Sequence, residues 1–493
     1  MSETFFEGLS PTDYTFLITE TPELHMHVQD VMVFDATPLT TSDGGIDFEA
    51  IKNAYGAKLH LIPRYRQKLM WQTKSRQSPY LKWISWQQSD ESKPPVWIDD
   101  DHFNVDYHVR HTSLPKPGSE QQLTKLAARI AAQPLDRSRP LWEIWVVEGL
   151  QENRFAIISK MHHCMVDAKS GIDLLNITMS TSPEYKTRRA KSYKPRPAPS
   201  QKELRDESLR DQVMAPVKIV ESITSLWKES ESFGQEIASR AKALSETFAA
   251  GIGKKRMPSV LNGSNGPHRT VAFYDTQLDY IKSIRRALGY SVNDIVLTIV
   301  TGAFRDTLLK SDQELENLPF RVAAPVSTWG RDQGHGAIGN EVTSWTIDLP
   351  VHIANPVDQL AHIHEITSEL KDSNHALAVD MITSFIEYTP GLMSLAARNA
   401  SGPINSIVTN MPGPQFPLYY LGAQMQRSYP VLPLLENMGI GIGVMSYNGI
   451  LCWGITSDLD IVADLAPFIK SLEKSIARVG KAAGLAKPPK VKI

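Results

Sequence analysis

The chain contains few cysteines and almost no excess charge. Only two of its 493 residues are cysteine, Cys164 and Cys452, and the formal net charge at pH 7 is −2. Two thiols so far apart exclude a disulfide scaffold and favour a reducing compartment. The balanced charge gives no support for nucleic-acid binding. With 42% hydrophobic and 22% charged residues, the composition is typical of a globular protein of about two to three domains.

The sequence also lacks an uninterrupted apolar run of the kind that crosses a membrane. Its N-terminus has neither the basic region nor the apolar core of a signal peptide. Two uncharged stretches are long enough to raise the question, but residues 399–426 contain four prolines and residues 437–457 contain several glycines. In the second stretch, Asn448-Gly449 predicts a hairpin of two short strands. We therefore expect a cytoplasmic protein and leave contact with a membrane surface open.

The chain does contain alternating strand and helix patterns in two regions. In residues 1–182, strands are expected at 31–34, 142–147 and 155–161, the last two as an antiparallel pair, and a helix is expected at 121–132. The alternation returns in the C-terminal half. Elements are expected there at 270–273, 278–288, from 291 onward, and at 320–326, 342–349, 404–409 and 467–483.

The segment between these regions differs in composition. Residues 183–200 combine six basic residues with four prolines, which is typical of a linker. Residues 201–250 have helical spacing with apolar residues near one face. The chain is therefore predicted to fold as two α/β lobes, residues 1–182 and 269–493, joined by a basic linker and crossover helices over residues 183–268.

A cluster of two histidines and an aspartate follows the apolar run at 155–161. His162, His163 and Asp167 form an HHxxxD pattern where a strand is expected to end. A histidine whose pKa lies near neutrality can take a proton from a weak nucleophile and return it. Asp167 could orient the ring or hold the loop through an arginine partner. The alternative is a pair of packed histidines beside a helix-capping aspartate.

Two other chemistries fit this cluster less well. Adjacent histidines lack the His-x-x-x-His spacing of a helical zinc site, so no metal is expected. Cys164 follows the histidines directly, but a buried structural thiol is a simpler interpretation than a nucleophile.

The cluster resembles the HHxxxDG motif of coenzyme A-dependent acyltransferases. Further segments resemble motifs of one branch, the bacterial bifunctional wax ester synthase/acyl-CoA:diacylglycerol acyltransferase family. These segments are Leu9–Asp13 with Met26–Val28, Pro140–Glu143, Ser291–Leu297 and Asn410–Pro414. The resemblance covers nearly the whole chain and is least distinctive in the linker and crossover. One position departs from the motif, because Ala168 replaces the usual glycine, and alanine adopts a positive φ less easily.

The resemblance implies a fold and a mechanism. The fold is that of chloramphenicol acetyltransferase, with two α/β lobes and a tunnel between them. His163 would be the general base for the hydroxyl of a long-chain alcohol or diacylglycerol, whose oxygen would attack the thioester of acyl-CoA directly in a ternary complex. His162 and Asp167 would support the motif structurally. Acyl-CoA is a substrate and no cofactor is implied, and such apolar acceptors suggest peripheral contact with a membrane or lipid droplet.

A second candidate functional segment begins at Ser291. If Ser291 is the N-cap of a helix and Asp294 the matching acid, Asn293 lies in the first turn, where free amides and the helix dipole favour negative charge. We expect Asn293 to donate to an oxyanion and Asp294 to be structural; the alternative makes both of them capping residues only. His25 and His27 are expected to be ordinary strand or loop residues. The residues predicted to shape the wall of the site are Pro140, Leu141, Trp142, Asn410, Pro412 and Gly413.

The basic linker and the function itself both leave alternatives open. The linker could be a solvated connector, a contact for anionic lipid headgroups, or a contact for the phosphates of coenzyme A. One rival function is another HHxxxD enzyme. It could be an amide-forming condensation domain, against which the lack of an attached carrier or adenylation domain argues, or an acyltransferase that uses a carrier-protein thioester. The other is a lipid-binding protein without catalysis, against which the intact His163, Asp167 and Asn293 argue.

Overall fold

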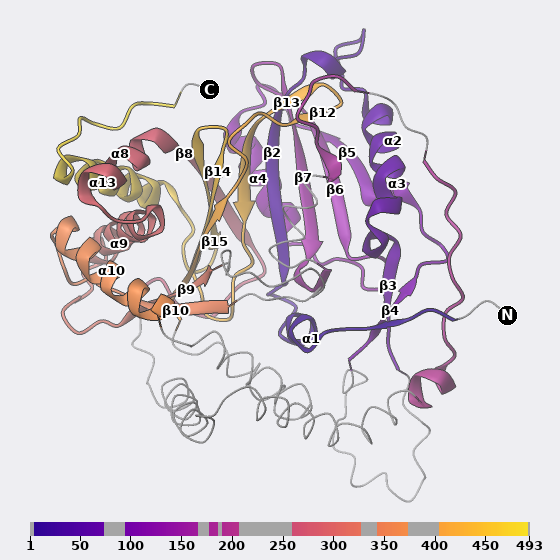
Figure 1. The fold of residues 1–493 in the computed structure, drawn as a ribbon, viewed down its shortest axis with the longest axis horizontal. Coiled ribbons are helices and arrows are strands. Elements are labelled where there is room, and N and C mark those ends of the chain that lie inside the picture. Colours follow the sequence, from indigo (N-terminus) through magenta and orange to yellow (C-terminus); the bar gives the residue numbers. More distant parts are fainter. Residues whose placement is uncertain are drawn as a thin grey trace, which may run out of the picture.

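Two six-stranded sheets lie side by side and form the cores of two lobes (Figure 1). The computed structural model describes residues 4–72, 94–165, 177–185, 190–206, 259–326, 343–372 and 404–491. A third, three-stranded sheet at the edge of the first lobe consists of β1 (Glu7–Gly8), β4 (Val96–Asp99) and β3 (Gln67–Met70). The two sheet-rich lobes confirm the predicted α/β architecture.

The first lobe is built on a sheet that is antiparallel except at one edge. Its strands, in spatial order, are β12 (Tyr419–Tyr420), β13 (Ala423–Val431), β2 (His27–Asp35), β7 (Arg154–His162), β6 (Trp142–Leu150) and β5 (Val109–Ser113). Only β5 and β6 run parallel. Strands β6 and β7 form the predicted antiparallel pair. Their apolar side chains alternate between two buried clusters, one on each face of the sheet.

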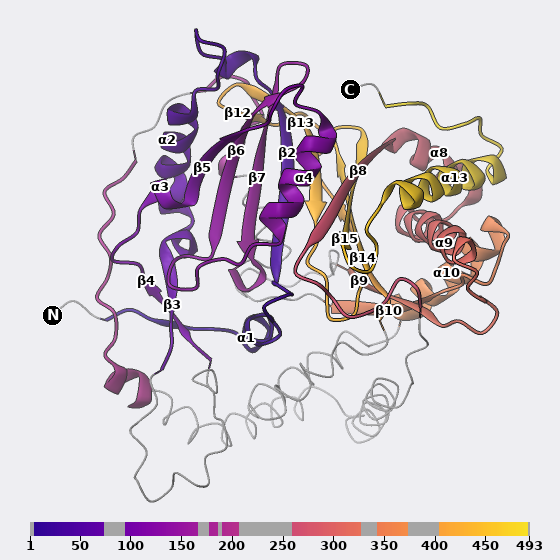
Figure 2. The same cartoon turned by 180° about the vertical axis from the view of Figure 1, so that it is seen from behind.

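Helices cover both faces of this first sheet. Helix α2 (Phe48–Lys58) packs on one face, with α3 (Val105–His108) beside it. Helix α4 (Glu120–Ala131) packs on the other face, next to the second lobe (Figure 2). A capping box at Ser119 begins α4, since Ser119 and Gln122 satisfy each other's backbone amides. Helix α1 (Pro11–Ile18) lies at the end of the sheet where β7 finishes.

The second lobe has a mixed sheet, and among its described residues four helices pack with it. Its strands, in spatial order, are β10 (Thr343–Leu349), β9 (Phe320–Val326), β11 (Ser406–Pro412), β14 (Ile440–Tyr447), β15 (Ile450–Asp458) and β8 (Arg269–Gln277). The helices are α8 (Leu278–Leu288), α9 (Val292–Lys310), α10 (Pro356–Asp372) and α13 (Ala466–Ala482). Asn448 and Gly449 form the predicted turn between β14 and β15, both with positive φ, at 45° and 81°.

Two strands from the C-terminal region, β12 and β13, belong to the first sheet. Strand β13 pairs with β2, although the next strand, β14, lies in the second sheet (Figure 1). The crossing is close, because a methyl group at Gly454 of β15 would clash with the backbone oxygen of Pro430 in β13. The two lobes are therefore joined through the chain itself as well as through side chains.

The described part of the basic linker runs along the first lobe. Arg196 donates from Nη2 to Oδ1 of Asp99 at 2.8 Å and from Nε to Oδ2 at 2.9 Å. Lys191 and Lys194 are exposed. Residues 186–189 and 207–258 lie outside the described residues, so the predicted boundaries at 182 and 268 and the three interpretations of the linker stay predictions.

Among the described residues, no single helix is long and apolar enough to cross a membrane. Helices α8 and α9 pass that test only as a pair, and they are bent by 102° at their junction. Most of α9 is buried in the core of the second lobe.

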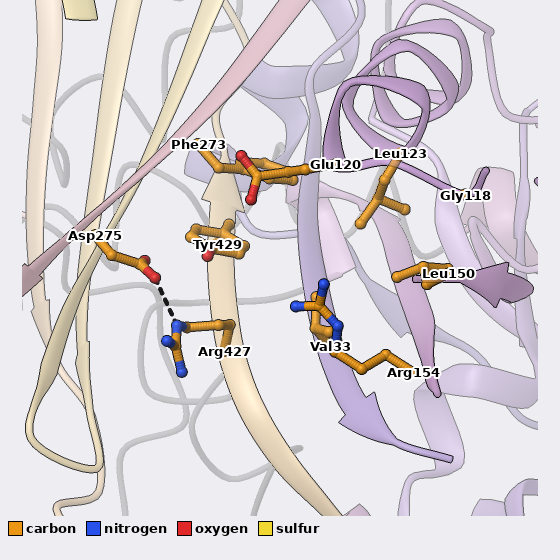
Figure 3. Close-up of a pocket in the computed structure, with 10 residues that line it drawn as sticks. All are labelled: Val33, Gly118, Glu120, Leu123, Leu150, Arg154, Phe273, Asp275, Arg427 and Tyr429. Atoms are coloured by element: carbon orange, nitrogen blue, oxygen red, sulfur yellow. Dashed lines mark hydrogen bonds and ion pairs between the residues drawn. The ribbon is translucent and has the colours of Figure 1, made fainter. Parts of the chain in front are cut away.

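A small pocket between the lobes contains an ion pair that joins them (Figure 3). Arg427 of β13 donates from Nε to Oδ2 of Asp275 in β8 at 2.6 Å. The two side chains are only 10% and 16% exposed. Beside them, the rings of Phe273 and Tyr429 stack with centroids 4.1 Å apart. The residues lining this pocket include none of the predicted site residues, so we interpret it as part of the lobe interface.

We predict that Asp275→Ala lowers the free energy of unfolding by about 3–5 kcal/mol, because Arg427 would keep a largely buried charge without its carboxylate. Urea denaturation followed by tryptophan fluorescence measures this change. The matched control is Glu7→Gln, which removes the more exposed ion pair with Arg64 and should cost less than about 1 kcal/mol. Equal small losses in the two variants would contradict a role for the Arg427–Asp275 pair in joining the lobes.

Candidate active site

The two motif histidines lie where β7 ends. His162 is the last residue of β7, and His163 begins a short 3-10 turn, η5 (His163–Met165). Three backbone amides hold this turn. The amide of His162 donates to the oxygen of Leu141 at 2.9 Å, that of His163 to Met26 at 2.8 Å, and that of Cys164 to Nδ1 of His162 at 3.1 Å. The position of His163 is therefore fixed by both neighbouring strands.

His162 is a buried residue with a defined tautomer. Its side chain is 1% exposed. Because Nδ1 accepts the amide of Cys164, the proton of the neutral ring is on Nε2. That nitrogen lies 3.2 Å from Oε1 of Glu20. These contacts suit a structural residue, although the role assigned to His162 stays a prediction.

His163 differs from its neighbour, because its side chain is partly exposed. Its ring stacks on Phe16, with centroids 3.9 Å apart and planes at 21°. Burial lowers the pKa of His163 to about 4. The imidazole is thus neutral near pH 7, the protonation state that a general base needs. Cys164, as expected, is a buried free thiol, and burial raises its pKa well above the usual value.

Asp167 and Ala168 lie outside the described residues. The structural role predicted for Asp167 and the effect of alanine in place of the motif glycine therefore stay predictions.

The Pro140–Trp142 segment packs behind the histidine turn. Leu141 is fully buried and contacts the cluster that contains Leu17 and Cys164. Trp142 is 1% exposed, and its Nε1 donates to the oxygen of Tyr65 at 2.8 Å. Pro140 is also buried. These residues support the turn from the core, and their predicted contact with substrate stays a prediction.

The helix start at Ser291 has the predicted geometry. Ser291 caps α9, its hydroxyl accepts the amide of Asp294, and Asp294 accepts the amide of Ser291, both at 3.1 Å. Asp294 is fully buried and also binds α10, through Thr367 at 2.8 Å and His364 at 3.1 Å. Burial alone would raise the pKa of Asp294, but its hydrogen bonds to Ser291, Thr367 and His364 outweigh burial and lower it. This geometry suits the structural role expected of Asp294.

Asn293 lies beside Asn410, as the shared wall of one site would require. Nδ2 of Asn410 donates to Oδ1 of Asn293 at 3.4 Å, which joins β11 to the first turn of α9. Within the described part of the chain, no hydrogen bond or ring contact links either asparagine to His163. The structure thus brings two of the predicted residues together and leaves their relation to His163 a prediction.

Gly413 is needed for close packing of the backbone. A methyl group there would clash with the backbone oxygen of Ser446 in β14, and the amide of Gly413 donates to Oγ of Ser446 at 3.2 Å. Pro412, one residue earlier, is the last residue of β11 and is exposed. This segment therefore supports the end of β11, and its contact with a ligand stays a prediction.

The structure adds residues that the sequence analysis missed. Glu20, between α1 and β2, contacts His162, His27 and Arg137. His27 lies in β2 as expected, but it also faces His162 across the sheet. The only sequence signal near these two residues was the family resemblance at Met26–Val28. That resemblance did not point to Glu20.

The same residues could be considered as metal ligands. Glu20, His27 and His162 each offer a ligand atom, and these atoms lie within 4.8 Å of one another. The chemistry of the donors argues against a metal, because Nε2 of His162 carries the proton and has no lone pair for an ion. Arg137 also donates to Glu20 at 2.7 Å and adds positive charge. The hydrogen bonds of Glu20 run instead to Arg137 and to the amide of Met26.

Comparisons with known proteins identify the family. Residues 9–296 match the profile of the wax ester synthase/diacylglycerol acyltransferase catalytic domain, and residues 338–479 match the C-terminal domain of the same family. A probable diacylglycerol O-acyltransferase of Mycobacterium tuberculosis is 32% identical over 79% of this chain and 84% of its own length. The chain belongs to the wax ester synthase/diacylglycerol acyltransferase family, which confirms the predicted acyltransferase.

Solved structures agree on the fold. The wax ester synthase/diacylglycerol acyltransferase of Marinobacter aquaeolei VT8 is similar with a TM-score of 0.63 and 21% identity, over 97% of this chain and 100% of that chain. The first condensation domain of the calcium-dependent antibiotic synthetase is similar with a TM-score of 0.58 and 12% identity, over 97% of each chain. At these identities the likeness shows the shared two-lobed fold alone.

The buried histidines make stability depend on pH. Burial lowers the pKa of His108, whose ring stacks on Trp142, from 6.5 to about 4. Below about pH 6.5 the unfolded state binds a proton that folded His108 does not, so stability falls as the pH falls toward 4. We predict that His108→Phe flattens this dependence by up to about 1.4 kcal/mol per pH unit in urea denaturation series. The control His102→Gln, at a side chain 87% exposed, should leave the slope unchanged. An unaltered slope in His108→Phe would contradict the prediction.

Proposed function

We propose that this acyltransferase moves a long-chain acyl group from acyl-CoA to the hydroxyl of a fatty alcohol, of diacylglycerol, or of both. The names of the matched family and of the mycobacterial relative support the acceptor classes. The single observation that carries the chemistry is His163, a neutral and partly exposed imidazole fixed at the end of β7 within the catalytic-domain match.

The proposed reaction is direct transfer. His163 takes the proton of the acceptor hydroxyl while the oxygen attacks the thioester carbonyl. The tetrahedral intermediate then collapses, the bond to sulfur breaks, and the imidazolium returns the proton to the departing coenzyme A thiolate. The ester and free coenzyme A leave, and no acyl-enzyme forms. A low pKa suits the second step, because the protonated His163 is a strong acid for a basic thiolate.

The oxyanion of the intermediate needs donors, and Asn293 is the proposed one. It lies in the first turn of α9, where unpaired amides and the helix dipole favour negative charge. Its Oδ1 is occupied by Asn410, so its own amide group is oriented away from that contact. Asn410 thereby sets which way the Asn293 side chain faces.

The acceptors are apolar, so we propose that the enzyme meets them at a membrane or lipid-droplet surface. The exposed Lys191 and Lys194 supply charge that an anionic surface would attract, whereas Arg196 is already paired with Asp99.

The first test compares coenzyme A release from palmitoyl-CoA by the wild-type protein and by His163→Ala. Each is assayed with hexadecanol, with diacylglycerol and without acceptor. We expect acceptor-dependent release that falls by at least about 100-fold in the variant, because general-base catalysis contributes about that much or more. The control is His102→Ala, at an exposed histidine outside the site, which should retain wild-type activity.

The outcomes separate the alternatives. Equal release by wild type and His163→Ala would remove His163 as the base. No release from palmitoyl-CoA with either acceptor, but release from an acylated carrier protein, would move the donor to a carrier thioester.

The second test addresses the oxyanion. Asn293→Ala should lower kcat by about 100- to 1000-fold with little change in KM, because an oxyanion donor acts on the transition state. Thermal unfolding checks that the start of α9 stays intact in Asn293→Ala. We expect it to stay intact, since Ser291 and Asp294 form the cap without Asn293. A change in KM alone would instead assign Asn293 to substrate binding.

A further inference from the structure

Glu20 makes an unusual number of contacts for one carboxylate. It lies on the loop between α1 and β2, and its side chain is 10% exposed. Oε1 accepts the amide of Met26 at 2.8 Å and lies 3.2 Å from Nε2 of His162 and 3.4 Å from Nε2 of His27. Oε2 accepts Nη2 of Arg137 at 2.7 Å. One side chain thus touches β2, the end of β7 and the loop after α4.

The carboxylate is ionised. Burial by itself raises the pKa of Glu20, but the contacts with His162, His27 and Arg137 outweigh burial and hold the pKa well below its usual range. Arg137 is held in turn, since Nη2 also donates to the oxygen of Leu17 at the end of α1. A fixed negative charge therefore faces the ring of His162.

This charge and one backbone amide determine the state of His162. The amide of Cys164 requires a lone pair on Nδ1, which puts the proton of the neutral ring on Nε2. Glu20 favours that proton position electrostatically from 3.2 Å. The two contacts together hold one tautomer and one orientation of the ring that precedes His163.

Met26 gives Glu20 a second connection to His163. The amide of Met26 donates to Glu20, and the oxygen of Met26 accepts the amide of His163 at 2.8 Å. Both routes, through His162 and through Met26, end at the backbone of His163. Displacement of His162 or of Met26 would turn the His163 ring, and small misplacements of a catalytic group lower the rate of reaction strongly.

We propose that Glu20 is a positioning residue for His163, acting through the tautomer of His162 and the backbone of Met26. The inference rests on the proposed function of His163. Glu20 itself does not need to touch a substrate.

The test uses Glu20→Gln and Glu20→Ala in the full chain, with Glu23→Gln as the matched control on the same loop. Glutamine keeps the acceptor for the amide of Met26 and an oxygen that can face Nε2 of His162, whereas alanine removes both. We expect kcat to fall at least 100-fold in Glu20→Ala and about tenfold or less in Glu20→Gln, with KM within about twofold of wild type. Glu23→Gln, at an exposed residue, should match the wild type.

A spectroscopic measurement reads the positioning directly. Nitrogen-15 spectra of histidine-labelled protein report the tautomer of each ring, and the His162 signals are assigned by their loss in His162→Asn. We expect the Nε2–H form in wild type and Glu20→Gln, and a mixture of tautomers in Glu20→Ala. Unchanged kcat and an unchanged His162 tautomer in Glu20→Ala would overturn the proposal, as would equal losses of kcat in both variants.

Failure of the Glu20 proposal can be told apart from failure of the proposed function. If wild-type protein released no coenzyme A with either acceptor, the proposed function would fail, and the tautomer of His162 in Glu20→Ala would still decide whether Glu20 controls the ring. If zinc bound wild type with one equivalent and lost affinity in Glu20→Ala, the group would be a metal site and the positioning proposal would be wrong.

Discussion

The register between β2 and β7 is the constraint on which the candidate active site depends. His27 pairs with His162 in this register, and the pairing places the end of β7 beside Met26 and Glu20. Because side chains alternate across a strand, a slip of one residue would turn His162 to the opposite face. Apolar side chains buried on both faces of the sheet prevent that slip, since a shifted strand would mismatch both clusters. The chemistry proposed for His163 is thus specified by core packing far from the ring.

The candidate residues Asn293, Asp294 and Asn410 belong to the second lobe. Three contacts fix the start of α9 in that lobe. They are the capping box at Ser291, the hydrogen bond from α10 to Asp294, and the hydrogen bond between Asn293 and Asn410. A base from one lobe and an oxyanion donor from the other can act together only if the lobes keep a fixed relation. The crossing of β13 and the buried pair of Arg427 with Asp275 supply that relation.

The sequence predicted what is decided locally. The Asn448-Gly449 turn, the cap at Ser291 and the pairing of β6 with β7 each depend on residues close together in the chain, and the structure confirms all three. The contacts of Glu20 with His162 and Arg137 span more than a hundred residues, and no periodicity or motif encodes them. The place of β13 in the first sheet was hidden for the same reason, because its strand pattern does not say which sheet it joins. Asp167 lies outside the described residues and stays a prediction.

The membership of β13 in the first sheet bears on how the protein is made. During synthesis, β2 is translated near the start of the chain, and its partner β13 emerges only near the end. Until then one long edge of β2 keeps its amides and carbonyls unpaired, and such an edge invites pairing with another chain. The first lobe therefore cannot finish folding on the ribosome ahead of the second, as independent domains commonly do. Because β13 belongs to the first sheet, the whole chain is a single folding unit, even though each lobe has its own core.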